Sequence, residues 1–287
     1  MRKILIIAVL IIIVIAAAVY WFISKPESVV EPEENYLSII ETETVSFGEG
    51  HTYSIDSAEF IIYPPDLDNF NFGYFEAYNN GELVYESVPQ YAVLDFLAFE
   101  TSDGKYFVLS DYSGGAHCCF KEYIFFLNDE ELKPIKELYT GNASIREEDL
   151  VLKDNNIYLQ VFDDRFAYFY TPYANSYFFF QHLKVDGDEI EIANSSFVLD
   201  HLQEVEKCEN EIEEILPDSS LDFESYAPKL VCIAVNYIIA SQEDKAWNKV
   251  QDYFTKIPLE FYGLSVDFET FKNEFLDLYQ LESFSEN

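Results

Sequence analysis

The segment of residues 91–127 constrains the fold more than any other part of the chain. Aromatic and β-branched residues occur in it at a density that fits a pleated, buried surface better than a helix. Two such runs, residues 91–99 and 105–110, are separated by a turn that contains Asp103-Gly104, and both of these residue types tolerate positive φ. A third run covers residues 120–127. We therefore predict three antiparallel strands.

The second connection of this segment is the unusual turn Ser113-Gly114-Gly115-Ala116-His117-Cys118-Cys119. Gly114 and Gly115 lack a Cβ atom, so the backbone can take left-handed angles or approach another segment closely. The two adjacent cysteines would point to opposite faces of a regular strand, and they cannot bond each other without leaving strand geometry. The turn is therefore the local feature that most needs an explanation.

Three interpretations of this turn stay open. Cys118 and Cys119 pack as small buried side chains, or they form a vicinal disulfide, or His117 and the thiolates bind a metal ion together with Asp111. We predict no metal, because adjacent ligands seldom reach one ion and no Cys-x-x-Cys motif completes a tetrahedral set. We also predict no catalytic dyad of His117 and Cys118, since such pairs are usually assembled from distant segments.

The strand pair, its Asp103-Gly104 turn and the Gly-Gly-Ala-His-Cys-Cys string resemble a group of uncharacterised bacterial extracytoplasmic proteins. Their strand pair is similar to the FG-GAP or VCBS repeats of β-propellers, in which an Asp-rich turn binds calcium. Only Asp103-Gly104 matches that turn, so the resemblance does not carry calcium binding to this chain. Residues 240–247 are similar to a helical tail of the same proteins. The resemblance implies no established activity and no cofactor.

The N-terminal residues 4–23 form an uninterrupted apolar run, long enough to cross a bilayer core of about 30 Å as a helix. Arg2 and Lys3 precede the run, so we expect the N-terminus to stay in the cytoplasm. A cleaved signal peptide with a site at residues 16–18 is the alternative. We favour a retained anchor in residues 1–25, because aromatic residues at 20–22 continue the run and suit a membrane interface. The sequence thus predicts a single-pass cell-membrane protein with its C-terminal domain outside the cytoplasm.

Beyond the anchor the chain is strongly acidic. All 53 Asp and Glu but only 14 of the 17 Lys and Arg lie after residue 25, a formal charge of −39 (14 minus 53). Such a surface repels nucleic acid and anionic lipid, and it attracts cations or basic partners. Residues 26–50 contain Pro26, Pro32 and several Glu, and they predict an acidic linker that merges into the first strand.

The remainder predicts an α+β fold. Residues 51–196 show strand patterns around turns such as Asn79-Asn80-Gly81, and they indicate an antiparallel β-rich domain, either a sandwich or part of a propeller. Within it, residues 166–180 are rich in aromatic side chains, which we expect mainly in the core, and His182 should be a hydrogen-bonded sheet residue. The apolar period changes from two to 3.6 near Val198, so residues 197–287 predict a small helical module.

Helix-capping residues and a proline indicate where the helices of this module begin. Asp200, Ser241 and Asp267 are expected to cap three of its helices, and Pro228 is expected to precede a buried helix. Cys208 lies on the apolar face of the first helix, and Cys232 lies early in the buried one. We therefore predict a Cys208–Cys232 disulfide, with pairing to Cys118 or Cys119, or a reduced Cys208, as alternatives.

No catalytic motif stands out in the chain. It contains no Gly-rich phosphate loop, no His-x-x-x-His and no nucleophile elbow. The leading hypothesis is a non-enzymatic envelope protein that binds a ligand or partner, with a basic protein or a saccharide as candidates. The alternative is a hydrolase of envelope polymers with His117 near its site, which an open pocket lined by His117 and Asp111 would favour. A third possibility is that the Gly114–Cys119 motif is purely structural.

Overall fold

A computed structural model describes residues 35–45, 48–66, 68, 71–114, 119–129, 131–218 and 220–280, which form one compact unit. The predicted membrane anchor lies outside these residues. Among the helices of the described ranges, none has both the length and the apolar character needed to span a membrane. The predicted α+β class, with antiparallel sheets and a small helical part, is confirmed.

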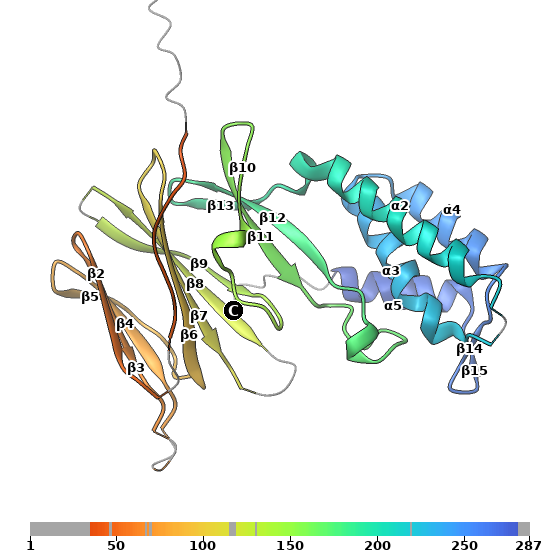
Figure 1. Cartoon of the computed structure of the whole chain (residues 1–287), viewed down its shortest axis with the longest axis horizontal. Helices are drawn as coiled ribbons and strands as arrows, with labels where there is room; N and C mark the ends of the chain where they lie inside the picture. The colour runs from red at the N-terminus through yellow and green to blue at the C-terminus, as the bar shows by residue number, and fades with distance from the viewer. Residues whose placement is uncertain are drawn as a thin grey trace, which may run out of the picture. The chain divides into compact units, whose positions relative to one another are not determined.

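Three antiparallel sheets make up the β-rich part (Figure 1). Each consists of strands that follow one another in sequence, with β1 added at one edge of the central sheet. The first sheet is β2 (His51–Ile55), β3 (Ala58–Tyr63), β4 (Tyr74–Asn79) and β5 (Glu82–Glu86). The central sheet is β1 (Ser38–Thr44), β6 (Ala92–Glu100), β7 (Lys105–Tyr112), β8 (Phe120–Asn128) and β9 (Glu131–Tyr139). The third is β10 (Leu150–Lys153), β11 (Asn156–Asp163), β12 (Phe179–Asp186) and β13 (Glu189–Ile192).

The central sheet is buried on both faces. Phe96, Phe107 and Phe125 belong to a core shared with the first sheet, whereas their neighbours Leu97 and Val108 belong to a core shared with the third sheet. Alternate residues of a strand point to opposite faces, so both sets must be apolar. This explains the almost continuous apolar runs of residues 91–127, a pattern more common in parallel sheets that are covered on both sides.

The helical part packs against the end of the third sheet. Phe166, Phe169 and Phe179 lie in the same core as the helices, so the predicted boundary at residue 197 does not separate two cores. Tyr168, by contrast, is 59% exposed. The helices are α2 (Val198–Ile215), α3 (Phe223–Ile239), α4 (Glu243–Phe254) and α5 (Phe268–Gln280), with short 3-10 turns at Glu147–Asp149, Tyr173–Asn175 and Asn194–Phe197 and a small hairpin, β14 (Glu260–Phe261) and β15 (Leu264–Ser265).

Several strand predictions need correction. Residues 53–63, whose partial alternation indicates a single strand, form a hairpin instead, because Asp56 takes a positive φ of 53° between β2 and β3. The acidic linker cannot extend to residue 50, since Ser38–Thr44 pairs with β6 and Val45 is buried. The sequence analysis also missed β9, whose alternation is broken by a register shift opposite Ile124 and Phe125.

The helix caps were predicted with mixed success. Asp267 accepts a hydrogen bond from the Thr270 amide (2.8 Å) and caps α5 as expected. Asp200 lies in the first turn of α2 rather than at its cap, because a 3-10 turn leads directly into the helix. Ser241 precedes the Gln242 cap of α4 and has a positive φ of 58°. Pro228 lies inside α3 rather than before it.

Candidate functional site

The unusual turn joins the ends of β7 and β8, and the structure describes both of its flanks. The Ser113 amide donates to the Cys119 carbonyl, and the Cys119 amide donates to Ser113 Oγ, both at 3.0 Å. Gly114 has φ +86°, a conformation that favours glycine, and a Cβ there would lie in tight contact, 3.3 Å from the Tyr91 ring. Cys119 is disulfide-bonded. Gly115, His117 and Cys118 lie outside the described residues, so the vicinal pairing stays a prediction.

Asp111 is fully buried at the end of β7, directly opposite Lys121 on β8. In the described part of the chain neither carboxylate oxygen has a hydrogen-bond partner. Burial raises the pKa of Asp111 to about 8, although the Lys121 charge and the Tyr112 amide act in the opposite direction. The side chain is therefore mostly protonated at neutral pH. It is absent from the lining of the pocket over β8 and β9. Because His117 lies outside the described residues, an open pocket lined by His117 and Asp111 stays untested.

A pocket of about 330 Å³ lies beside this carboxyl, over β8 and β9 and next to β5. Most of its wall is aromatic or aliphatic, and its charged groups come from β8 and β9. The lining residues are Tyr85, Lys121, Tyr123, Ile124, Phe125, Pro134, Ile135, Lys136, Glu137 and Tyr139. Concave, largely apolar sites with a few placed polar groups are the usual form of a small-molecule site.

Strand register assembles the polar part of the pocket. Lys121 pairs with Tyr139 across β8 and β9, and Tyr123 pairs with Glu137, so all four side chains share the face that carries Asp111. The Lys121 ammonium is 2.5 Å from Glu137 Oε2, and the Tyr85 hydroxyl donates to Glu137 Oε1 at 2.5 Å.

The electrostatics of this group follow from burial and pairing. Burial raises the pKa of Glu137, but hydrogen bonds from Lys121 and Tyr85 outweigh it, so the net shift is downward. Lys121 Nζ also lies 4.8 Å from the centre of the Tyr123 ring. Burial raises the pKa of Tyr123, and its buried hydroxyl has no partner among the residues that the structure describes.

The sequence analysis singled out Asp111 but missed the pocket residues. Lys121, Tyr123, Glu137 and Tyr139 look like ordinary alternating strand positions. The alternation of side chains along β8 and β9 could have placed these residues on the face of Asp111. It could not be used because β9 itself was not predicted.

The opposite face of the central sheet holds a second buried carboxyl with a different environment. Glu122 accepts hydrogen bonds from Ser110 Oγ (2.5 Å), Thr140 Oγ1 (3.0 Å) and the Ile145 amide (3.3 Å). Burial raises its pKa to about 8, partly offset by these donors. Nearby, Asp95 accepts from Thr44 and Ser144. The carboxylate oxygens of Glu122 and Asp95 thus all accept hydrogen bonds. These bonds join strands β1, β6, β7 and β8 to the loop after β9.

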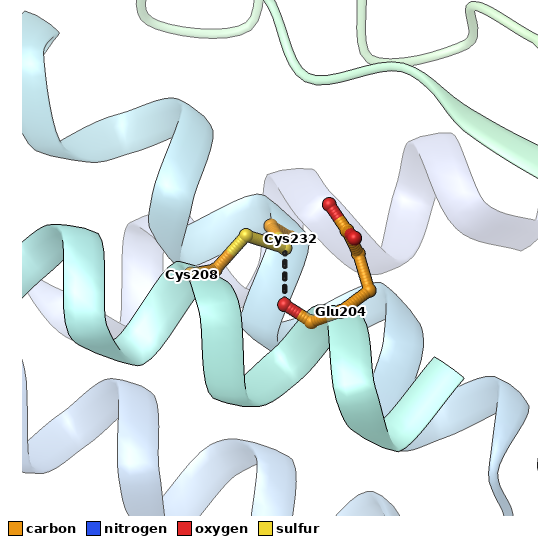
Figure 2. Close-up of side chains that lie close together, drawn as sticks. All are labelled: Glu204, Cys208 and Cys232. Atoms are coloured by element: carbon orange, nitrogen blue, oxygen red, sulfur yellow. Dashed lines mark hydrogen bonds between the residues drawn. A yellow bond between two sulfur atoms is a disulfide. The ribbon is translucent and has the colours of Figure 1, made fainter. Parts of the chain in front are cut away.

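In the helical part Cys208 and Cys232 form the disulfide that the sequence favoured, with an S–S distance of 2.04 Å (Figure 2). A Glu204 carboxylate oxygen and both sulfurs lie within 4.8 Å of one another. The bonded sulfurs carry no thiolate, so this group is not a metal site in its present state. The dashed line from Cys232 to the Glu204 carbonyl, at 3.6 Å, is a sulfur–oxygen contact, because a disulfide sulfur has no proton to donate.

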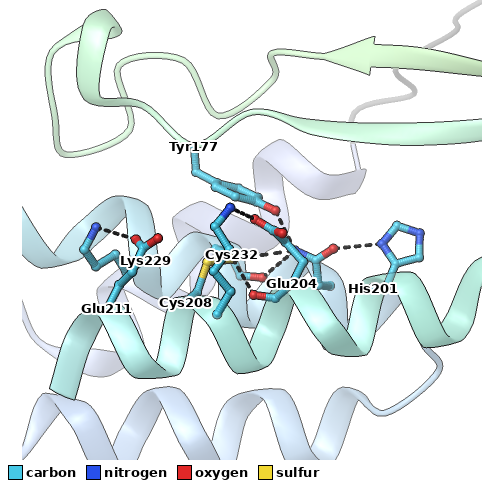
Figure 3. The surroundings of a disulfide bond; sticks show 9 residues. Tyr177, His201, Glu204, Cys208, Glu211, Lys229 and Cys232 are labelled. Atoms are coloured by element: carbon cyan, nitrogen blue, oxygen red, sulfur yellow. Dashed lines mark hydrogen bonds and ion pairs between the residues drawn. A yellow bond between two sulfur atoms is a disulfide. The ribbon is translucent and has the colours of Figure 1, made fainter. Parts of the chain in front are cut away.

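A polar network joins this disulfide to Tyr177, in the segment before β12 (Figure 3). Asn236 donates to the Tyr177 hydroxyl at 2.8 Å, and its Oδ1 lies 2.8 Å from His201 Nδ1. His182 stacks on Phe197 with ring centres 3.5 Å apart. The prediction that His182 is fully hydrogen-bonded is wrong, since its buried Nδ1 has no partner within the described ranges. Burial, followed by the His201 charge, lowers the pKa of His182 to about 4.

Comparison with known proteins gives no further guide to the site. No protein-family model matches the chain, and no curated protein or solved structure matches it either. The pocket at β8 and β9 is therefore judged on its geometry alone.

Proposed function

We propose that this chain is a membrane-anchored extracytoplasmic protein that binds a small ligand without transforming it. Its ligand site is the pocket formed by Tyr85, Tyr123, Glu137 and their neighbours. The observation that carries the proposal is a 330 Å³ pocket with a largely aromatic and aliphatic wall and the Lys121–Glu137 ion pair in its lining.

The charged groups support binding rather than catalysis. Lys121 and Glu137 neutralise each other, and the pKa of Glu137 is lowered, so this carboxylate is a poor proton donor near neutral pH. Asp111 and Glu122, whose pKa values burial raises to about 8, are fully buried and are absent from the lining of the pocket.

A ligand screen on the full chain tests the proposed site. A library of small metabolites, read by thermal shift and by ligand-observed NMR, should yield binders whose effect is lost in Tyr139→Ala. Tyr139 is 50% exposed at the rim, so its removal should leave the core intact. Tyr262→Ala, at an 80% exposed tyrosine of the β14–β15 hairpin, is the matched control. Binders that Tyr139→Ala leaves unaffected, or no binders at all, would refute the proposed site.

The location is tested independently. A reporter that is active only in the cytoplasm, fused after Asn287, should give no signal, because Arg2 and Lys3 hold the N-terminus inside. A bright fusion would refute the extracytoplasmic assignment.

A further inference from the structure

The outer face of the first sheet is rich in tyrosine. Residues of β3 and β4 alternate, so that one set packs on the central sheet and the other set faces outward. Cross-strand register pairs the six outward residues directly, Glu59 with Tyr78, Ile61 with Glu76, and Tyr63 with Tyr74. Together they form the tyrosine face. They are half-buried, and Figure 1 shows the first sheet as an outer layer of the β-rich part.

The tyrosine face carries carboxylates but no cation. Residues 26–104 contain no Lys or Arg, so β2, β3, β4 and β5 have none. Glu86 on β5 lies directly opposite Glu76, and like charges in opposed positions destabilise a sheet. Lys105 of β7 pairs with Asp56 in the β2–β3 turn, and no Lys or Arg of the described chain forms an ion pair with Glu76 or Glu86. A bound cation would relieve their repulsion.

Tyrosine hydroxyls take the place of cations around Glu76. Tyr63 and Tyr78 donate to the same oxygen, Glu76 Oε2, at 2.7 and 2.6 Å. These bonds hold the carboxylate and both rings in place without neutralising the negative charge. The other oxygen, Oε1, accepts no hydrogen bond from the described residues and can accept one from a ligand. Beside it, the Tyr63 and Tyr74 rings stack with centres 4.4 Å apart and planes 12° from parallel.

A guanidinium group matches this arrangement better than a metal ion or an ammonium group. It is flat, so it stacks on an aromatic ring while its N–H donors reach a carboxylate in the same plane. An ammonium is a compact charge without a flat face. Calcium takes six to eight oxygen ligands, whereas the described chain places no third Asp, Glu, His or Cys close to Glu76 and Glu86.

The spacing along β4 sets the form of the partner. Tyr74, Glu76 and Tyr78 occupy alternate positions, about 7 Å apart at about 3.4 Å per residue. An extended peptide with arginine at every second position presents guanidinium groups on one side at the same spacing.

We infer that the tyrosine face binds an arginine-rich, extended segment of a partner polypeptide. Its guanidinium groups stack on the tyrosine rings and donate to Glu76. The acidic charge of the chain strengthens the attraction, and the aromatic rings select arginine over lysine. None of the six residues of this face lines the pocket over β8 and β9, so binding here does not depend on the proposed function.

Labelled peptides test this surface. Fluorescence anisotropy with the full chain compares Arg-Ser-Arg-Ser-Arg with Lys-Ser-Lys-Ser-Lys, which has the same charge and spacing. We expect the arginine peptide to bind about 5-fold more tightly, because an ammonium cannot stack on the rings. Raising NaCl from about 50 mM to about 500 mM should weaken this binding, since charge attraction at an exposed face is screened. Equal affinities of the two peptides, or no binding of the arginine peptide, overturn the inference.

Variants locate the bound peptide. Glu76→Gln removes the charge but keeps an oxygen for the two tyrosine hydroxyls, and it should weaken binding about 5-fold. Tyr74→Leu keeps an apolar side chain without a π surface, and it should reduce the preference for arginine over lysine. Glu206→Gln removes the same charge from an exposed position of α2 and should leave binding unchanged.

Thermal unfolding of each variant separates loss of binding from loss of fold. If Tyr74→Leu fails to fold, Glu76→Gln and Glu206→Gln still decide the location, because both conserve side-chain shape. A stronger effect of Glu76→Gln than of Glu206→Gln supports the tyrosine face. Equal effects would show a general attraction of basic peptides to the acidic chain and would overturn the assignment to this face.

Discussion

Each face of the central sheet holds a buried carboxyl group, and the two groups differ in their hydrogen-bond partners. Asp111 and Glu122 lie on adjacent strands, both are fully buried, and burial raises the pKa of each to about 8. Glu122 accepts three hydrogen bonds, whereas Asp111 has no partner in the described chain. A raised pKa therefore does not distinguish a structural carboxyl from one left with unused capacity. The hydrogen-bond partners make that distinction.

The contrast also places the pocket. The face of Glu122 is closed by the loop after β9, which supplies Thr140 and Ile145. The face of Asp111 carries the Lys121–Glu137 pair and the Tyr123 hydroxyl, which has no partner in the part of the chain that the structure describes. Buried polar groups with hydrogen-bond partners lie on the face of the central sheet that stabilises the fold. Buried polar groups without partners among the described residues lie on the face that we propose binds a ligand.

The largest expected effect compares truncation of the two carboxyls. Glu122→Ala leaves three buried donors without an acceptor and creates a cavity, so it should lower the free energy of unfolding by about 4 kcal/mol. Asp111→Ala removes a carboxyl for which no hydrogen-bond partner is found among the described residues, and it should cost less than about 1 kcal/mol. Urea unfolding at pH 7 measures both. Equal losses would show that the difference in partners has no energetic meaning.

The pH dependence of Asp111 gives the next effect. Its pKa rises from 3.8 to about 8 on folding, so its contribution to stability is complete below about pH 4 and is lost as the pH rises toward 8. Asp111→Asn cannot ionise, so the variant should not show this loss of stability with rising pH. Relative to the parent chain, the variant should gain about 3 kcal/mol between pH 5 and pH 7, at about 1.4 kcal/mol per pH unit. Urea midpoints at the two pH values test this, and parallel curves would contradict the raised pKa.

A buried base should show the opposite sign. The pKa of His182 falls from 6.5 to about 4 on folding, so its contribution is present above pH 6.5 and is lost as the pH falls toward 4. His182→Phe preserves a ring to stack on Phe197 and should reduce the acid destabilisation between pH 6.5 and pH 5 by about 1.5 kcal/mol. The remaining dependence should include His201, whose pKa burial also lowers. If His182→Phe loses as much stability between pH 6.5 and pH 5 as the parent chain, groups other than His182 cause the acid destabilisation.

The smallest effect compares two hydroxyl groups. Ser110→Ala removes one of the three donors to Glu122 and should cost about 1 kcal/mol. Tyr123→Phe removes a hydroxyl that has no partner among the described residues, and it should change stability by less than about 0.5 kcal/mol. Thermal unfolding of the two variants gives the comparison. A larger loss in Tyr123→Phe would reveal a partner for this hydroxyl and weaken the case for the pocket.

The sequence by itself determined the local features of this protein. The Asn80-Gly81 turn takes positive φ at both residues, Asp267 caps its helix, and Cys208 and Cys232 lie on helix faces that meet. These outcomes depend on backbone preferences and apolar periods within a few residues of one another, so they could be predicted from the letters alone.

Only the tertiary structure decided the site. The pocket needs Tyr85 from the first sheet, Lys121 from β8 and Glu137 from a strand that the sequence did not reveal. Whether a buried carboxyl is satisfied depends in the same way on residues distant in sequence, as the loop that brings Ile145 to Glu122 shows. Register and sheet stacking bring such groups together through long-range packing. The local sequence does not reveal that packing, because each residue of an alternating strand is compatible with many cross-strand partners.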